Sequence, residues 1–386
     1  MIDRVKALLP NRRQGEIPIP RAAIVELTRR CNLACRHCYA TPERGRRELS
    51  REEIVGLLDQ LRDIGTLFLT FVGGDPTVNR DFVSIVRHAS RARFAVQFFS
   101  NGLLIDDATA EALAAENLLH VGISIYGATP EIHDDLTRRR GSFEKTLRAV
   151  RRLKERGVHV VFKFIATNRN AHEAWAAVEM ARRLEIPIRV DPTITARDDL
   201  NSDTIALRPS RDMHKRLLRD FQGPEWTPQE VDRAGNRDLS CGMAKTLVSV
   251  NAYGDVFPCV TLPIPAGNIR YAPFRTIWEE STLLRELRGF HRSSRLQGCP
   301  SCGLRAYCSR CPGNTYTETR NLYGPSPSAC GEAVLWKELE NESKGIVEEV
   351  PLPPGLADGH LPGWTPAELA HEAGCSVGLR WAADGA

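Results

Sequence analysis

The placement of its cysteines constrains this chain more than any other sequence feature. Cys31, Cys35 and Cys38 lie within eight residues near the start, and Cys375 stands alone near the end. The other seven lie within about ninety residues, after a long stretch without cysteine: Cys241, Cys259, Cys299, Cys302, Cys308, Cys311 and Cys330. In a reducing compartment, cysteines that gather in this way are typical of metal or redox sites rather than of disulfides.

Composition and charge exclude several classes of partner. With 42% hydrophobic and 26% charged residues over 386 positions, the chain can bury a sizeable core. Its net charge of +4 is too small to indicate a nucleic acid or a membrane as partner. The sequence has no apolar run of about 18 residues, and its N-terminal segment lacks the apolar stretch of a secretory signal. We therefore expect a cytoplasmic chain.

The stretch between the two cysteine groups alternates strand and helix patterns, which predicts parallel βαβ units and an α/β fold. About 180 residues are too few for a full eight-unit barrel, so the pattern leaves a partial barrel and a doubly wound sheet open. The predicted strands are Ile24–Thr28, Thr66–Phe71, Ala95–Ser100, His120–Ile125, His159–Ile165 and Ile188–Asp191. The predicted helices begin with a capping box at Ser50 and continue with Asp81–Ser90, Asp106–Asn117, Ser142–Arg156 and Ala171–Leu184.

The first cysteine group follows the first predicted strand directly, in the pattern CxxxCxxC. Ligands of parallel α/β proteins bind at the carboxyl ends of the strands, where this loop lies. Three soft thiol ligands suit zinc or an iron–sulfur cluster, and three ligands leave one metal position open for chemistry.

These residues resemble the signature of the radical SAM superfamily, in which an aromatic residue, here Tyr39, comes just after the CxxxCxxC motif. The resemblance implies a partial (β/α)6 TIM-like barrel. It also implies a [4Fe–4S] cluster that is held by Cys31, Cys35 and Cys38 and binds S-adenosylmethionine at its fourth iron. Electron donation from that cluster would split the sulfonium into methionine and a 5′-deoxyadenosyl radical, which takes a hydrogen atom from the substrate.

Further segments at predicted strand ends fit the same resemblance. GGDP at 73–76 follows the second strand and resembles the family's GGEP motif, with an aspartate in place of the usual glutamate. Segments at the ends of the third and fourth strands resemble those that contact the ribose and carboxylate of the same cofactor. The residues implied to bind the cofactor are Tyr39, Gly73, Gly74, Asp75, Pro76, Ser100, Asn101 and Ser124. Lys163 on the fifth strand faces either the cofactor or solvent and is not among them.

The seven later cysteines have the spacing C-x17-C, then C-x2-C-x5-C-x2-C, then x18-C. By itself this pattern also fits two structural zinc sites. It resembles the SPASM domain that follows the barrel in many radical SAM enzymes. This resemblance implies a small cysteine-rich α+β domain with two auxiliary iron–sulfur clusters, which in that family are of the [4Fe–4S] type. The implied ligands of the first are Cys241, Cys259 and Cys311, and those of the second are Cys299, Cys302, Cys308 and Cys330. Because no eighth cysteine completes the first set, we expect an open iron or an oxygen or nitrogen ligand there.

The sequence thus predicts an extension at 1–20, a radical SAM barrel at 21–195, a linker at 196–238, a SPASM domain at 239–335 and a C-terminal helix and tail at 336–386. The resemblance implies an oxidoreductase or maturase that installs a cross-link, a thioether or an oxidised residue in a ribosomally made peptide or protein. Its expected partners are a separate recognition protein and an electron donor like flavodoxin or ferredoxin. Two alternatives stay open: the same chemistry on a small molecule or cofactor precursor, and a zinc or electron-transfer protein without catalysis. No catalytic side chain is assigned.

Overall fold

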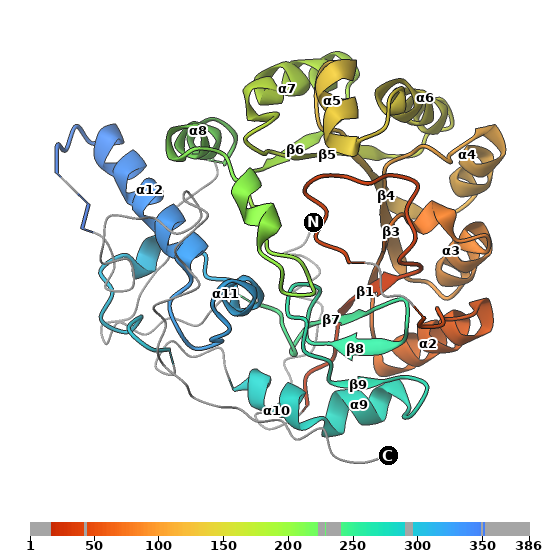
Figure 1. Cartoon of the computed structure of the whole chain (residues 1–386). Coiled ribbons are helices and arrows are strands. Elements are labelled where there is room, and N and C mark those ends of the chain that lie inside the picture. Colours follow the sequence, from red (N-terminus) through yellow and green to blue (C-terminus); the bar gives the residue numbers. More distant parts are fainter. Residues whose placement is uncertain are drawn as a thin grey trace.

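Six parallel strands curve into a partial barrel, with helices on its outer face (Figure 1). The computed structural model describes residues 17–41, 45–222, 228, 241–289, 296–348 and 350–351. The barrel strands are β1 (Ala22–Glu26), β2 (Phe68–Val72), β3 (Ala95–Ser100), β4 (Leu118–Ser124), β5 (Val160–Ile165) and β6 (Ile188–Asp191). The helices between them are α2 (Arg51–Ile64), α3 (Phe82–Arg91), α4 (Asp107–Ala114), α5 (Pro130–Thr137), α6 (Ser142–Glu155) and α7 (Ala174–Arg183). The prediction of an α/β fold with a partial barrel is confirmed.

Alternation along each strand separates an apolar core from a polar barrel interior. Phe98, Phe162 and Phe164 are fully buried in the hydrophobic core of the structure. Because successive side chains of a strand point to opposite faces, their neighbours Gln97 and Lys163 point into the barrel. The strands therefore build the scaffold with one face and line an internal cavity with the other.

The sheet continues beyond the barrel into the cysteine-rich region. Strand β7 (Leu247–Val250) pairs with β1 in parallel, with Ala22 opposite Leu247. Strands β8 (Asp255–Phe257) and β9 (Gly267–Asn268) then add antiparallel pairs, so the full order is β6-β5-β4-β3-β2-β1-β7-β8-β9. The remaining helices are α8 (Arg211–Leu217), α9 (Phe274–Glu280), α10 (Thr282–Arg288), α11 (Pro312–Thr319) and α12 (Pro327–Ser343).

The structure differs from the predicted elements in a few places. Helix α5 was not predicted, and the third predicted helix ends at Ala114 rather than Asn117. Residues 196–222, within the predicted linker, contain α8 and two short helical turns. Cys375, most of the predicted tail and residues 1–16 of the predicted extension lie outside the described residues. Among the described helices, none combines the length and the apolar character needed to span a bilayer.

Candidate functional site

The first cysteine loop lies at the carboxyl end of β1 and is held there by distant segments. Backbone amides of the loop donate to the end of α5, with Arg36 N at 3.0 Å from Leu136 O. On the other side, Arg197 donates to the carbonyl of Cys38 over 2.7 Å. A cavity of about 1060 Å³ opens here, and all three cysteines of the motif line it.

The three thiols are close enough to influence one another. Burial, together with the neighbouring thiols of Cys38 and Cys31, raises the pKa of Cys35 to about 12. Burial also raises the pKa of Cys31 and of Cys38. Such thiols lose their protons only to a bound metal. The ten cysteines of the described part of the chain are all free, so no disulfide competes for them.

The three thiols are donors of the kind that hold an iron–sulfur cluster. In such a cluster each protein ligand binds a different iron atom, and three thiolates leave the fourth iron open. By its chemistry, the donor set at 31, 35 and 38 therefore fits the expected [4Fe–4S] cluster. Within the described ranges, no three Cys, His, Asp or Glu side chains converge on a single metal position.

Gly73 and Gly74 bring the loop after β2 against the cysteine loop. Gly74 N donates to Thr28 O over 2.8 Å, and a Cβ on Gly74 would lie 2.3 Å from Arg30 O. Gly73 has a φ of +143° and would place a Cβ 2.2 Å from Thr28 O. The two glycines thus permit a close backbone approach to the residues that precede Cys31.

Asp75 joins the ends of β2 and β3 beneath the same cavity. Its buried carboxylate accepts hydrogen bonds from Asn101 N at 2.7 Å, Ser100 Oγ at 2.9 Å and Thr77 N at 3.0 Å. Burial raises the pKa of Asp75, while these hydrogen bonds lower it. The aspartate that replaces the family's glutamate is therefore engaged by the protein itself. Asn101 in turn donates to Asn32 in the cysteine loop over 2.7 Å.

Most of the predicted cofactor residues face one space. The cavity is lined by Tyr39, Gly73, Gly74, Asp75, Ser100, Asn101 and Ser124. Pro76 does not line it, because this residue is buried at the start of a 3₁₀ turn, Pro76–Val78.

Residues of the predicted linker also border the site, and the sequence did not indicate them. Asp198 forms an ion pair with Arg29 and accepts a hydrogen bond from Thr41 N at 2.9 Å. Arg29 also lies 2.7 Å from the buried carboxylate of Glu26. The run ARDDL is polar and has no periodic pattern, so no signal in the sequence marked Asp198 as part of the site.

The later cysteines gather in two groups. Cys311 interacts electrostatically with Cys241 and Cys259, and the Thr261 hydroxyl lies 3.3 Å from Cys259 Sγ and 3.7 Å from Cys311 Sγ. Electrostatic interactions likewise connect the members of the second group, Cys299, Cys302, Cys308 and Cys330. The buried guanidinium of Arg310 lies beside both groups.

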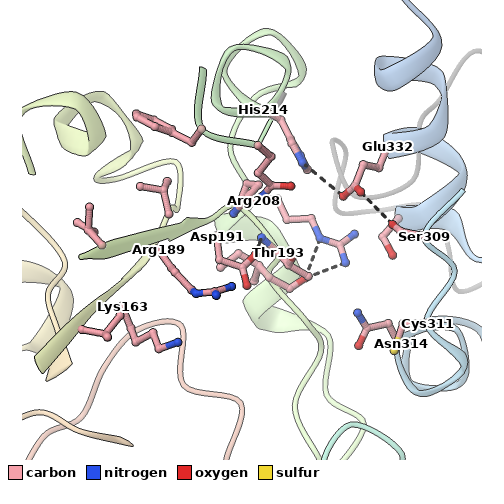
Figure 2. Close-up of a pocket in the computed structure, with 18 of the residues that line it drawn as sticks. Lys163, Arg189, Asp191, Thr193, Arg208, His214, Ser309, Cys311, Asn314 and Glu332 are labelled. Carbon is pink, nitrogen blue, oxygen red and sulfur yellow. Dashed lines mark hydrogen bonds and ion pairs between the residues drawn. The ribbon is translucent and has the colours of Figure 1, made fainter. Parts of the chain in front are cut away.

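A second cavity of about 1140 Å³ lies between the barrel and the cysteine-rich region (Figure 2). Strands β5 and β6 form one wall, and α8, α11 and α12 contribute to the others. Cys311 lines this cavity, and Phe99, Thr193 and Ile194 line both cavities. The two spaces therefore adjoin, and together they reach from the first cysteine loop to Cys311 in the cysteine-rich region.

A partial barrel with three thiols at the carboxyl edge of its sheet and seven more beside it has the features of an iron–sulfur protein. Two family models match: the radical SAM superfamily over residues 25–181, and the SPASM iron–sulfur cluster-binding domain over residues 241–312. The chain therefore belongs to the radical SAM superfamily and carries a SPASM domain. It is an enzyme, which excludes the alternative of a protein without catalysis. The expected cofactors, a [4Fe–4S] cluster with S-adenosylmethionine and auxiliary iron–sulfur clusters, agree with this family.

Curated relatives divide between two kinds of name. An AdoMet-dependent heme synthase of Methanosarcina barkeri is 28% identical, over 80% of this chain and 95% of that protein. The mycofactocin maturase MftC of Mycolicibacterium smegmatis is 29% identical, over 82% of this chain and 84% of that protein.

Solved structures of SuiB from Streptococcus suis share the fold. The complex with S-adenosylmethionine has a TM-score of 0.64 and 17% identity, over 81% of this chain and 77% of that one. The complex with the precursor peptide SuiA has a TM-score of 0.63 and 17% identity, over 81% of this chain and 76% of that one.

Proposed function

We propose that this enzyme abstracts a hydrogen atom from a ribosomally made peptide or protein and installs a cross-link, a thioether or an oxidised residue. The observation that carries the proposal is the pair of adjoining cavities, because a substrate in the second one lies between the two cysteine regions. Its volume of about 1140 Å³ exceeds the range of about 300–1,000 Å³ that is usual for small-molecule sites. SuiB, which shares the fold, has been solved with a precursor peptide.

In this proposal Cys31, Cys35 and Cys38 hold the [4Fe–4S] cluster. Tyr39 and the segment at 73–75 shape the space for S-adenosylmethionine, together with the ends of β3 and β4. When bound to these three thiolates, the cluster would supply an electron for the reductive cleavage of S-adenosylmethionine. The residues of the cavity orient the substrate and keep water away from the reacting carbon.

The SPASM cysteines would hold the clusters that complete the oxidation. Cys241, Cys259 and Cys311 would hold one auxiliary cluster, and Cys299, Cys302, Cys308 and Cys330 the other. A substrate that loses a hydrogen atom and then a proton must also lose an electron. Cys311 lines the cavity, so a cluster held there would be an electron acceptor at the cavity wall. Thr261 lies between two thiols of the first group and would hydrogen-bond to their sulfurs, which tunes a cluster's potential. A flavodoxin- or ferredoxin-like donor and a separate recognition protein stay part of the proposal.

A second candidate is the same chemistry on a small molecule or cofactor precursor. The match to an AdoMet-dependent heme synthase favours it, because the alignment covers 95% of that protein. Both candidates share the cluster and the radical step, so they differ only in the occupant of the second cavity.

The experiment is anaerobic reconstitution followed by reduction with dithionite. We expect release of 5′-deoxyadenosine, and a loss of about two daltons from the correct peptide by mass spectrometry. Cys35→Ala should abolish release of 5′-deoxyadenosine but keep the auxiliary iron, while Cys302→Ala should lose auxiliary iron and keep S-adenosylmethionine cleavage. Full cleavage by Cys35→Ala would refute the ligand assignment. Oxidation of a tetrapyrrole but of no peptide would favour the second candidate.

A further inference from the structure

Two cations stand side by side in the second cavity. Lys163 on β5 and Arg189 on β6 are direct partners in the parallel ladder. Figure 2 shows both side chains extending from the sheet into the same space, opposite α11. His120 on β4 lines the same wall. Three neighbouring strands therefore present nitrogen-bearing side chains to one part of the cavity.

Neither cation has an anionic partner among the described residues. No carboxylate lies within ion-pair distance of Lys163 or Arg189, and the Lys163 ammonium instead stands 4.9 Å from the ring centroid of Phe99. Asp191 is the acidic residue nearest along β6, and its carboxylate accepts a hydrogen bond from Thr193 N at 2.8 Å. By contrast, Arg208 in the same cavity forms an ion pair with Glu318.

This arrangement has an energetic cost in the free protein. Like charges on adjacent strands repel each other, and the partial burial of Lys163 removes some of the water that would screen the repulsion, although Arg189 is exposed. Burial lowers the pKa of Lys163 and the charge of Arg189 lowers it further, while the charge of Asp191 partly offsets both effects. An anion bound between the two side chains would turn this cost into a favourable interaction.

The rest of the cavity also presents polar atoms without partners. His120 Nε2 and Asn314 Oδ1 are buried and make no hydrogen bond within the described part of the chain. Asn314 comes from α11 and points from the opposite wall toward the cations in Figure 2. A ligand that fills this space therefore meets cations on one side and a hydrogen-bonding amide on the other.

We propose that Lys163 and Arg189 bind a carboxylate group of the substrate. Arginine presents a fork of donors that matches a carboxylate, and the lysine ammonium adds a second charge-assisted hydrogen bond. The charges of Lys163, Arg189 and Asp191 add up to +1. This sum matches a monoanionic carboxylate better than a dianionic phosphate. A substrate anchored in this way would extend past Phe99 and Ile194 toward the S-adenosylmethionine cavity.

This inference rests on the proposed function, because it assumes that the second cavity holds the substrate. A substrate carboxylate has three sources: the C-terminus of a peptide, an acidic side chain, or a propionate-like chain of a metabolite. The corresponding probes are N-acetylphenylalanine, N-acetylglutamic acid α-amide and 3-phenylpropionate. Each probe has a neutral control, the compound with its carboxylate converted to a carboxamide.

The test measures binding of these probes to the reconstituted enzyme with S-adenosylmethionine, by saturation-transfer NMR. We expect at least one carboxylate to bind with a Kd of about 1 mM, and its amide about 10-fold more weakly or worse. Lys163→Met and Arg189→Gln should each weaken carboxylate binding about 10-fold. Lys145→Met and Arg151→Gln remove exposed cations of α6, away from the cavity, and should bind like the wild type.

Equal binding of carboxylates and amides, no binding of any carboxylate at about 10 mM, or wild-type affinity in both cavity variants would each overturn the inference. Iron content and thermal midpoint show whether the variants are folded. The carboxylate that binds most tightly and depends on both cations identifies the source. Failure of the wild-type enzyme to release 5′-deoxyadenosine would refute the proposed function instead, and would leave the carboxylate preference measurable.

Discussion

Replacing Gly74 with alanine should displace the loop that carries the first cysteine group. A Cβ at this position would lie 2.3 Å from Arg30 O, whereas ordinary contact begins at 3.4 Å, so the two loops must separate by about 1.1 Å. The obstacle is backbone, which cannot move aside like a flexible side chain. Overpacking of this kind costs about 1–3 kcal/mol. The two backbone hydrogen bonds between the loops, from Gly74 N and Asp75 N, are worth about 0.5–1.5 kcal/mol each.

The measurable result is a loss of iron. Because Arg30 immediately precedes Cys31, we expect Gly74→Ala to lose up to one cluster of iron and sulfide, in the manner of Cys35→Ala, and its release of 5′-deoxyadenosine to fall with it. The matched control is Gly56→Ala on the exposed face of α2, where a Cβ meets nothing within 4 Å. That control should keep its iron and gain about 0.5–1 kcal/mol of stability. The reasoning would be refuted if Gly74→Ala kept its full iron content and only required more S-adenosylmethionine. In that case the missing side chain would make room for S-adenosylmethionine rather than for the backbone of Arg30.

Two other charged contacts lead to predictions. Arg310→Met removes a buried positive charge beside both SPASM cysteine groups and should lower the potential of at least one auxiliary cluster by about 50–100 mV, a Coulomb effect of about 1–2 kcal/mol. A redox titration followed by EPR that shows unchanged potentials would contradict this. Hydrogen bonds from Arg270 lower the pKa of Glu53 to about 2, so this contact stabilises the fold fully above about pH 4.5 and loses its effect as the pH falls toward 2. At pH 7, Glu53→Gln should lower the free energy of unfolding by about 1–2 kcal/mol in a urea titration, after a discount for solvent screening. Glu52→Gln, at an exposed side chain of the same helical turn, should leave the free energy of unfolding nearly unchanged.

Local sequence patterns predicted the barrel strands well, because the apolar and β-branched residues of each buried strand are visible within a few consecutive positions. The bounds of β3 and β6 match the predicted ranges, Ala95–Ser100 and Ile188–Asp191. Helix α5 was missed because its sequence, PEIHDDLT, is short and polar and has no long apolar stripe. The pairing of β1 with β7 joins segments more than 200 residues apart, and no local pattern encodes such a partner.

The candidate site was predictable only where a motif carries the chemistry. The cysteines and the glycines stand in recognisable spacings, and the structure brings most of these residues to one cavity. Asp198 reaches the site through tertiary contacts, which the polar run around it does not indicate. For Lys163, alternation along β5 leaves two faces open, and only the curvature of the sheet shows that its face is the interior.

The ladder between β1 and β7 has a consequence for electron transfer. The strand that leads into the first cysteine loop is flanked on one side by the barrel and on the other by the strand that follows Cys241. The SPASM region cannot move away from the barrel as a hinged lid without breaking the backbone hydrogen bonds between β1 and β7. Any electron that passes between the two regions would therefore cross a gap of constant width in every turnover. The substrate must enter by a route that does not require a hinge motion at the β1–β7 ladder.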